Sequence, residues 1–444
     1  MYEQKDIDFI KSFLKSLTDS NIEYCILRKA NMILTGRAHD IDMVVDVSKI
    51  DNVYKILSEL SKELGWKLFL RTEKDNGNLV SVHYFATHEE QIYIVHFDLF
   101  INFSWKAIPI LKNRELLLNK IEKDSVYSCS ASVEAITKLF SRYLHHGYIK
   151  DEYKEDIFAI FLNNNSEIVR EMSQFLDKDT AELIYDLVMA RDWNGLIRLN
   201  QKVQDCIQFR YYNTSPKRKL MDNLNSKLFK LKRYFNHKGV MVAFLGTDGS
   251  GKSTIISNLS VVLERTFDES QIKYYHWRPK YIKSPKGEKG SSANVTNPHS
   301  NKPYSKVTSF IKFMYFNLDY IFGYWFSVKV HLGKNQLVVF DRYYYDYMLD
   351  KYRYRLNLSD SIINAFIPLI PKPDITFLLS GDPNILYERK KEITVEEVEK
   401  QINRILDQKN NIPNSRVVDV NQSVENVVFD TSTFILEFME NREL

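Results

Sequence analysis

Cysteine is scarce in this sequence. The 444 residues contain three cysteines, Cys25, Cys129 and Cys206, which are far apart and odd in number. They therefore predict neither a disulfide framework nor a zinc site made of four cysteines. This cysteine usage favours a reducing cytosol.

The sequence also lacks a recognisable targeting or membrane-spanning segment. Its N-terminal residues contain no basic region followed by an apolar stretch, so they do not resemble a secretory signal. The most apolar long stretch, residues 310–330, is interrupted by Lys312, Asn317 and Asp319. We therefore expect a buried helix there rather than a membrane span, and a cytoplasmic protein.

Neither sign of charge is in large excess. The net charge is +4, which gives no reason to expect nucleic acid as a partner. The apolar content of 44% and the charged content of 27% are typical of a globular protein. Because 444 residues are too many for one core, we expect two or three domains.

Hydrophobic spacing divides the chain into four regions, of which three are domains. Residues 1–125 predict a mixed α+β domain, with helices at 7–17 and 51–64 and strands at 24–27, 41–47, 79–86 and 91–101. Residues 126–215 predict a helical subdomain, because the apolar spacing is helical from Ser132 to Phe209. Residues 239–444 predict a doubly wound α/β domain, with a polar insertion at 283–306 that is typical of a mobile loop.

The fourth region, residues 216–238, predicts a basic amphipathic helix. Leu220, Leu224, Leu228 and Leu231 share one stripe, Lys and Arg residues surround it, and Asp222 is the one acidic residue. The helix is either a linker that packs its stripe on a neighbouring domain or a helix that lies on an anionic membrane surface.

Residues 240–254 contain the most specific motif of the chain. An apolar strand runs into a G-x-x-x-x-G-K-S phosphate loop, and a helical pattern follows. In such a unit the loop N–H groups wrap the α- and β-phosphates, Lys252 reaches the β- and γ-phosphates, and Ser253 offers its hydroxyl to Mg²⁺. We therefore predict ATP and Mg²⁺ as cofactors, with the nucleotide held by Gly246, Asp248, Gly249, Ser250, Gly251, Lys252, Ser253 and Thr254.

Three further motifs indicate a kinase. Asp341 and Arg342 end an apolar strand, where the carboxylate can hold Mg²⁺ and the guanidinium can clamp a phosphoryl oxygen. Arg278 ends another predicted strand, where it either contacts the acceptor or packs before Pro279. Arg389 and Lys390 lie on a later helix, which is either a lid that stabilises the transferring phosphoryl group or a charged surface helix.

With these motifs, residues 239–444 resemble thymidylate kinase. The matching residues are the run 244–254 with its Asp248, the triplet Asp341-Arg342-Tyr343, the strand that begins at Pro373-Asp374 and the helix that carries Arg389. In that family the loop aspartate contacts the sugar of the acceptor nucleotide, and the Asp-Arg pair serves magnesium and the acceptor phosphate. The resemblance implies these roles for Asp248, Asp341 and Arg342.

The sequence departs from thymidylate kinases where they recognise thymine. The family's Ser and Ala-Tyr-Gln run are replaced by Asp346 and Leu349-Asp350-Lys351, and its Arg-Glu-Pro by Trp277-Arg278-Pro279. The expected pocket offers hydroxyls and carboxylates, which suit a polyhydroxylated acceptor at least as well as thymine. Its predicted lining is Tyr343, Tyr344, Tyr345, Asp346, Tyr347 and Asp350. We expect the acceptor to be contacted by Asp248, Arg278, Arg342, Tyr345 and Asp346.

The chain resembles more closely the thymidylate-kinase-like proteins of bacterial surface-polysaccharide gene clusters. These also carry a long insertion with a Pro-His pair, here Asn297-Pro298-His299, and a helix like that at 319–325.

Residues 1–125 contain a second candidate site. Asp40 and Asp42 lie two apart on one predicted strand, and Asp98 lies in an otherwise apolar strand. Three strand carboxylates can hold the metal ions of nucleotidyl transfer. With Arg37, the pattern resembles the nucleotidyltransferase fold, although Leu27-Arg28-Lys29-Ala30 replaces its usual phosphate-holding turn. An active domain, a degenerate ligand-binding domain and purely structural aspartates all stay open.

These patterns together favour a Mg²⁺- and ATP-dependent phosphotransferase with a small or glycan-linked acceptor. We expect Lys252, Asp341, Arg342 and Arg389 to be catalytic, and Ser253 and Asp341 to hold the metal. The alternatives are a nucleotidyltransferase using Asp40, Asp42 and Asp98, a genuine dTMP kinase, and a nucleotide-switched binding protein. Membrane contact through 216–238 and a homodimer are further open alternatives.

Overall fold

The structure is a computed structural model that describes residues 4–33, 35, 40–123, 126–213, 215–264, 266–267, 272–283, 303–350, 353–391 and 394–443. Contacts between Cα atoms divide the chain into two compact units, the first with residues 1–86, 93–229 and 443–444, the second with residues 87–92 and 230–442. The boundary at 229/230 falls inside a continuous helix, α10 (Pro216–Phe235). Arg37, Lys351 and the insertion residues 297–299 lie outside the described residues.

The first unit is built on a seven-stranded mixed sheet with the order β3-β4-β5-β2-β1-β9-β8. Strand β2 pairs antiparallel with β1 and parallel with β5. The four predicted strands are confirmed. Five further strands were not predicted: β3, in which charged residues interrupt the apolar pattern, and the short strands β6, β7, β8 and β9. The strands are β1 (Tyr24–Ile26), β2 (Ile41–Val45), β3 (Lys67–Lys74), β4 (Leu79–His88), β5 (Gln91–Phe100), β8 (Ile121–Lys123) and β9 (Val126–Ser128), beside a separate pair, β6 (Phe103–Trp105) and β7 (Ile108–Leu111).

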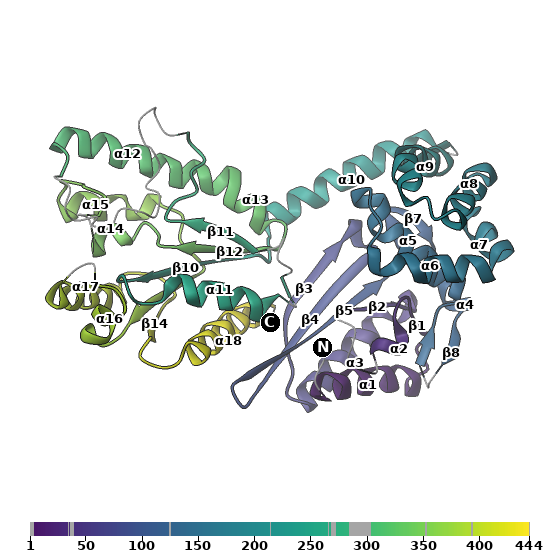
Figure 1. Cartoon of the computed structure of the whole chain (residues 1–444), viewed down its shortest axis with the longest axis horizontal. Coiled ribbons are helices and arrows are strands. Elements are labelled where there is room, and N and C mark those ends of the chain that lie inside the picture. The colour runs from purple at the N-terminus through teal and green to yellow at the C-terminus, as the bar shows by residue number, and fades with distance from the viewer. Residues whose placement is uncertain are drawn as a thin grey trace. The chain divides into compact units, whose positions relative to one another are not determined.

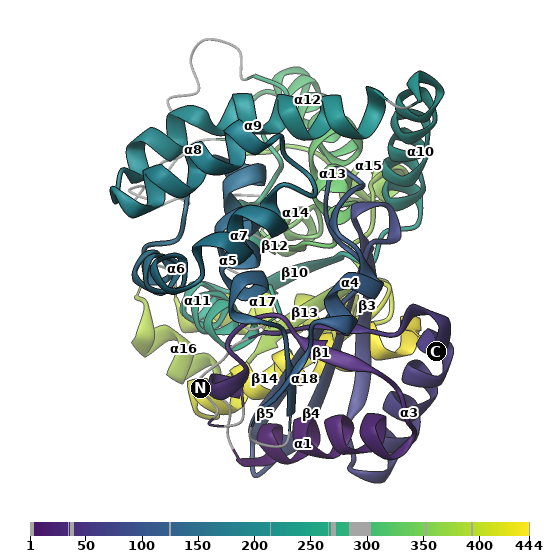
Figure 2. The same ribbon diagram turned by 90° about the vertical axis from the view of Figure 1, so that its right-hand side faces the viewer.

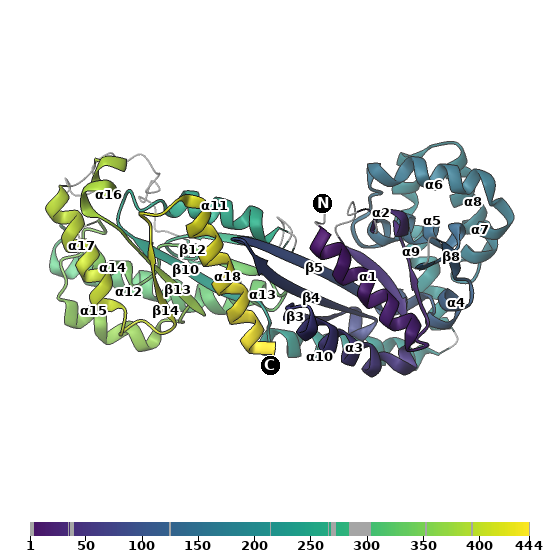
Figure 3. The same ribbon diagram turned by 90° about the horizontal axis from the view of Figure 1, so that it is seen from below.

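Both faces of this sheet are covered by helices, because successive side chains of a strand point to opposite faces. Tyr24 and Ile26 join one core with α1 (Gln4–Asp19) and α3 (Ile50–Glu63), which lie along the sheet in Figure 3. Cys25 faces the other way and joins the core of the helical region. The helices of this helical region lie together in Figure 2 and are α5 (Ala131–His146), α6 (Asp151–Asn163), α7 (Asn165–Met172), α8 (Lys178–Met189) and α9 (Trp193–Asn213). The unit also contains two short helices, α2 (Ala30–Ile33) and α4 (Asn113–Leu118).

The second unit contains a five-stranded sheet with the order β11-β12-β10-β13-β14, and all its strand pairs are parallel. This sheet confirms the α/β class predicted for the C-terminal half. The strands are β10 (Val240–Gly246), β11 (Ile272–His276), β12 (Leu337–Asp341), β13 (Ile375–Ser380) and β14 (Ser415–Asp419).

Helices lie on both faces of the parallel sheet (Figure 1). Met241 and Ala243 share a core with α12, whereas Phe244 stacks on Phe377 at 5.0 Å, and Phe377 in turn contacts Phe434 of α18. The helices of this unit are α11 (Lys252–Leu263), α12 (Lys306–Gly323), α13 (Lys329–Leu332), α14 (Asp346–Leu349), α15 (Asp360–Phe366), α16 (Pro383–Arg389), α17 (Val395–Gln408) and α18 (Val424–Glu443).

The carboxyl ends of these strands determine where a site can form. Because the strands are parallel, Gly246, His276 and Asp341 end at one edge of the sheet, and His276 is the register partner of Asp341. Ligands of open α/β sheets bind at this edge.

The predicted buried helix at 310–330 is only half correct. Phe313, Phe316 and Tyr320 face the sheet, but the opposite side of the segment is exposed to solvent. The exposed apolar residues there are Phe310, Ile311, Leu318, Phe322, Trp325, Phe326 and Val330. Among the described helices, none is long and apolar enough to cross a membrane.

Candidate functional site

The phosphate loop lies between β10 and α11, as the sequence predicted. Gly249 and Gly251 have φ angles of 85° and 79°, which favour glycine. A Cβ atom on Gly249 would lie 2.4 Å from the carbonyl oxygen of Leu386, in the middle of α16. The glycine therefore supplies both the backbone torsion and the space that let α16 approach the loop.

Lys252 is buried inside this loop. Its ammonium group donates hydrogen bonds of 2.8 Å to the carbonyl oxygens of Gly246 and Thr247. Burial, and then the positive charge of Arg342, lower its pKa to about 8. The lysine charge thus lies within the ring of loop amides that holds polyphosphate in P-loop proteins, while Ser253 and Thr254 are exposed at the first turn of α11.

Asp341 ends β12 with its side chain largely buried. Its Oδ2 accepts a hydrogen bond of 3.2 Å from the Tyr274 hydroxyl and lies 3.5 Å from Nδ1 of His276. Burial opposes ionisation, but the contact with His276 and the charge of Lys252 lower the pKa of Asp341 overall. Its Oδ1 is buried and has no hydrogen-bond partner among the described residues. An ionised carboxylate with one such oxygen fits Mg²⁺, which usually takes one or two carboxylates and keeps several waters.

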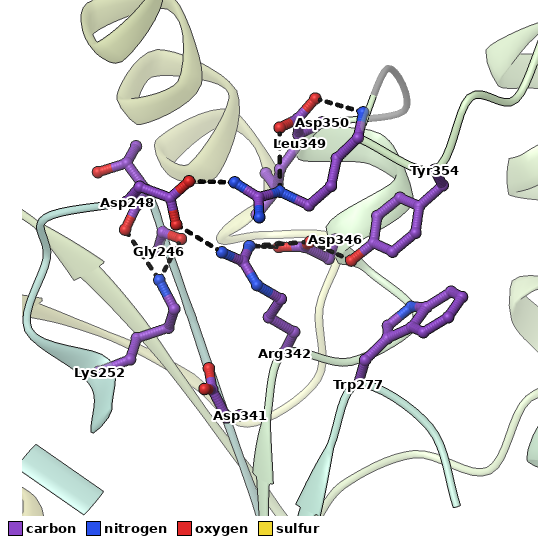
Figure 4. A network of polar contacts seen from close by, with 12 residues as sticks. Gly246, Asp248, Lys252, Trp277, Asp341, Arg342, Asp346, Leu349, Asp350 and Tyr354 are labelled. Carbon is purple, nitrogen blue, oxygen red and sulfur yellow. Dashed lines mark hydrogen bonds and ion pairs between the residues drawn. The ribbon is translucent and has the colours of Figure 1, made fainter. Parts of the chain in front are cut away.

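The next residue, Arg342, is the centre of a charged network (Figure 4). Its φ is 70°, and its backbone N–H donates to the carbonyl oxygen of Phe244 at 3.0 Å. One end of the guanidinium donates to Asp248 at 2.8 Å, and the other donates to both oxygens of Asp346 at 3.1 and 3.2 Å. The structure therefore brings three predicted acceptor residues together.

Arg353 is a member of this network that the sequence did not reveal. It pairs with the second carboxylate oxygen of Asp248 and lies 3.4 Å from Asp350. Burial works against ionisation of Asp248, but the two arginines lower its pKa well below its usual range. Arg353 lies in a turn outside any recognised motif, so no sequence signal marked it.

An aromatic pair borders the network. The Tyr354 hydroxyl donates to Asp346, and the Tyr354 ring stacks on Trp277 at 4.6 Å (Figure 4). The four tyrosines expected in the pocket are instead members of the hydrophobic core, namely Tyr343, Tyr344, Tyr345 and Tyr347. The Tyr344 hydroxyl donates to the carbonyl oxygen of Ile363 at 2.8 Å, and burial raises the pKa of Tyr345 to about 12.

Arg278 lies in a different environment from Arg342. Its guanidinium pairs with the buried Asp319 of α12 at 2.8 Å. Asp319 also accepts hydrogen bonds from the N–H groups of Lys280 and Ile282, at 2.9 and 2.7 Å. This geometry matches the packing alternative that the sequence left open for Arg278.

The two basic residues at the end of α16 point to different surroundings. Arg389 is exposed, and its guanidinium donates to the carbonyl oxygen of Val420 at 3.1 Å. The Cβ of Lys390 lies 3.5 Å from the Cβ position of Gly249, and its charge contributes to the low pKa of Asp248. Lys390, rather than Arg389, is therefore the basic residue beside the phosphate loop.

In the first unit, the structure brings Asp40, Asp42 and Asp98 together. Asp42 and Asp98 are register partners on the parallel strands β2 and β5. His96 contacts Asp40 at 3.2 Å and Asp98 at 2.9 Å, and Arg28 pairs with Asp42 at 2.7 Å. Within the described ranges, no cluster of three or more His, Cys, Asp or Glu side chains is arranged to hold a metal ion.

The charges of this cluster compensate one another. Burial opposes protonation of His96, yet Asp98 and Asp40 raise its pKa to about 9. The ring of His96 stacks at 3.9 Å on His83, whose pKa is well below its usual value because of burial and the neighbouring imidazolium. Arg28 and His96 therefore occupy positions at the carboxylates that metal ions would take in the predicted two-metal centre.

Comparison with known proteins supports the assignment of the second unit. The family model of thymidylate kinase matches residues 244–430. Among solved structures, the thymidylate kinase from Ehrlichia chaffeensis matches with 19% sequence identity over 44% of this chain and 98% of that chain, at a TM-score of 0.31. No curated protein sequence matches the chain significantly. The family match confirms a thymidylate kinase-like domain, whereas the nucleotidyltransferase resemblance of residues 1–125 stays a prediction.

The two loop glycines provide a test of the site's geometry. Alanine at Gly251 meets its nearest atom at 3.9 Å and costs mainly the left-handed torsion, about 1–2 kcal/mol. Alanine at Gly249 carries the same torsional cost and also meets the Leu386 carbonyl oxygen at 2.4 Å. We expect Gly249→Ala to lower the Tm and the affinity for ATP more than Gly251→Ala does. Equal decreases in Tm and in ATP affinity for the two variants would show that α16 does not pack closely against this loop.

The ion pairs of the first unit make a second prediction. We expect the wild-type protein and the Asp42→Asn variant to show equal rises in Tm with Mg²⁺ or Mn²⁺, each relative to its own metal-free Tm. If ion pairs already occupy the aspartates of the first unit, only the second unit binds the ion. If Asp42 were a metal ligand, the wild type would gain further stability, about 2.7 kcal/mol at a hundredfold excess over Kd. A larger rise in wild type would therefore support the metal centre.

Proposed function

We propose that the chain is a Mg²⁺- and ATP-dependent phosphotransferase whose acceptor is a small or glycan-linked molecule other than dTMP. The observation that carries the proposal is the Asp248–Arg342–Asp346 network, which joins the phosphate loop to the segment that follows β12. The thymidylate kinase-like domain at 244–430 supports the reaction class.

The donor side consists of groups that suit a nucleoside triphosphate. Lys252 and the loop amides would hold the phosphates, and Ser253 and Asp341 would hold Mg²⁺. The unpaired Oδ1 of Asp341 supports this assignment. When bound, Mg²⁺ neutralises charge on the phosphates.

The acceptor side combines two arginines with three carboxylates. Arg342 and Arg353 can hold an anionic group of the acceptor, and the ionised Asp248 can accept a hydrogen bond from a hydroxyl. Lys390 lies beside Gly249 of the phosphate loop and its charge acts on Asp248, so it is well placed for the phosphoryl group in transit. Arg278 has a packing role, since its guanidinium forms an ion pair with Asp319.

These groups perform positioning and electrostatic stabilisation. An acceptor hydroxyl oxygen forms a bond to the γ-phosphorus and its proton passes to water. The bond to the β,γ-bridging oxygen breaks, and ADP leaves with the electron pair. No covalent bond to the protein is needed, because phosphoryl transfer in P-loop enzymes is catalysed mainly by orientation and charge. The buried positions of Lys252 and Arg342 strengthen their electrostatic effect.

The carboxylates favour a polyhydroxylated acceptor over thymine. Asp346 and Asp350 are fixed at Arg342 and Arg353, where thymidylate kinases carry residues that recognise the base. Sugar hydroxyls donate to carboxylates, whereas a thymine carbonyl would face like-charged oxygen. We therefore place the acceptor among sugars or glycan intermediates, in keeping with a role in surface-polysaccharide synthesis.

A nucleotidyltransferase reaction in the first unit is the second candidate. It is favoured by one observation, the direct pairing of Asp42 with Asp98 in the sheet. Its product would be pyrophosphate rather than ADP.

Replacing Lys252 tests the donor site. Lys252→Ala removes a donor fixed inside the loop, so kcat for phosphoryl transfer should fall about 10²- to 10³-fold, the usual cost of one preorganised donor. Lys334→Ala, which removes an exposed charge from the same unit, is the matched control and should keep wild-type turnover. Unchanged ADP release in Lys252→Ala, with the melting curve intact, would overturn the kinase assignment.

The acceptor prediction is tested with dTMP. ADP release in a coupled assay should stay at the rate measured without acceptor, because unpaired polar groups in a site reject mismatched ligands strongly. Turnover near ~10 s⁻¹, a typical enzyme value, would identify an ordinary thymidylate kinase.

A further inference from the structure

Helix α10 has one side that contacts the protein. Asp222, Ser226, Phe229 and Arg233 are half-buried and recur at helical spacing. The Ser226 hydroxyl accepts a hydrogen bond of 2.9 Å from the side-chain amide of Asn76. The orientation of the helix is therefore fixed, and its other side faces solvent.

The exposed side of α10 is apolar. At 100° per residue, its apolar positions form a stripe about 100° wide, the width of a stripe that normally faces a core. The fractional exposures show that no described part of the chain covers it: Leu220 72%, Met221 54%, Leu224 49%, Leu228 54%, Leu231 53% and Phe235 58%.

Basic residues flank this stripe on both sides. Lys219, Lys227 and Lys230 lie along one border, and Arg218 and Lys232 lie along the other. The single acidic residue, Asp222, is on the protein-facing side, where it interacts with Tyr212. The solvent-facing half of the helix therefore combines apolar, positively charged and neutral amide side chains, and its described residues include no acidic one.

Within the second unit, the C-terminal turn of α10 lies beside the segment after α12. The Tyr234 hydroxyl donates to the carbonyl oxygen of Trp325 at 2.7 Å. The ammonium group of Lys329 lies 4.6 Å from the Trp325 ring and 5.7 Å from the Phe235 ring. Trp325 and its neighbour Phe326 are 42% and 60% exposed, so aromatic side chains extend the leucine stripe.

We propose that this surface, the stripe of α10 with Trp325 and Phe326, docks onto an anionic lipid bilayer. Apolar side chains enter the acyl boundary of a membrane, and each flanking Lys or Arg adds electrostatic attraction to an anionic surface. Tryptophan at the end of the stripe suits the headgroup region, where one side of the ring is apolar and the other is wet.

Charge complementarity favours an anionic bilayer on this surface over a second copy of the chain or a nucleic acid. Two copies packed through α10 would bring cationic flanks together without acidic partners. A nucleic acid would engage the lysines but leave the leucines in water. An anionic bilayer satisfies both kinds of side chain.

Vesicle sedimentation with the full chain tests the proposal. Vesicles of phosphatidylcholine with about 30% phosphatidylglycerol supply the anionic surface, and pure phosphatidylcholine is the reference. We expect binding to the mixed vesicles only, weakened as NaCl rises from about 0.1 to about 1 M, because the Debye length falls from about 10 to about 3 Å.

Two variants with equal net charge separate the stripe from the charge. Leu224→Glu/Leu228→Glu should weaken partitioning at least about tenfold more than Asn223→Glu/Asn225→Glu, since only the first pair removes buried apolar area. Circular dichroism and Lys252-dependent ATP turnover check that both variants are folded.

Three outcomes would overturn the proposal. They are absence of binding to the mixed vesicles, equal weakening in the two variants, and a dimer in light scattering that dissociates only in the leucine variant. The last outcome would identify a second copy of the chain as the occupant.

Discussion

The candidate site depends on the compensation of one buried positive charge, that of Arg342. A buried guanidinium is costly unless carboxylates pair with it and its hydrogen bonds are satisfied. Asp248 from the phosphate loop and Asp346 from α14 provide this compensation at 2.8 and 3.1 Å. The positive φ of Arg342 lets its backbone bond to β10 while its side chain reaches both partners. The phosphate loop and the segment that follows β12 are thereby fixed to each other.

The same charge shapes the neighbouring groups. Together with burial it lowers the pKa of Lys252 to about 8, and it contributes to the low pKa values of Asp248 and Asp341. Arg353 adds a second cation at Asp248, so the loop carboxylate is shared between two arginines. Phosphoryl transfer requires such preorganised charge rather than a nucleophilic side chain. In the first unit, Arg28 and His96 pair with Asp42 and Asp98, so these aspartates are already compensated by side chains of the protein.

Sequence reasoning identified what is encoded locally. The phosphate loop and the strand ending in Asp341 follow from short patterns, and the structure places them on neighbouring strands of the parallel sheet. The three aspartates Asp40, Asp42 and Asp98 were also expected together, but the register that pairs Asp42 with Asp98 was not predicted. Sequence reasoning failed where contacts between residues far apart in the chain determine which side chains meet. Asp319 holds Arg278 across 41 positions, Arg353 reaches Asp248 across 105, and the triple tyrosine run is core rather than pocket. The exposed faces of α10 and α12 were also ambiguous, since an apolar stripe has the same spacing whether or not it is covered.

The central claim is that the Arg342 network serves transfer of the γ-phosphoryl group. Its most direct test is product analysis with ATP labelled at the γ-phosphate, incubated with pools of sugars, sugar phosphates and nucleoside monophosphates. The account predicts ADP and label on a sugar-type acceptor, with both lost in Arg342→Met and retained in Arg278→Lys. Label released as pyrophosphate, or transfer that persists in Arg342→Met, would contradict it.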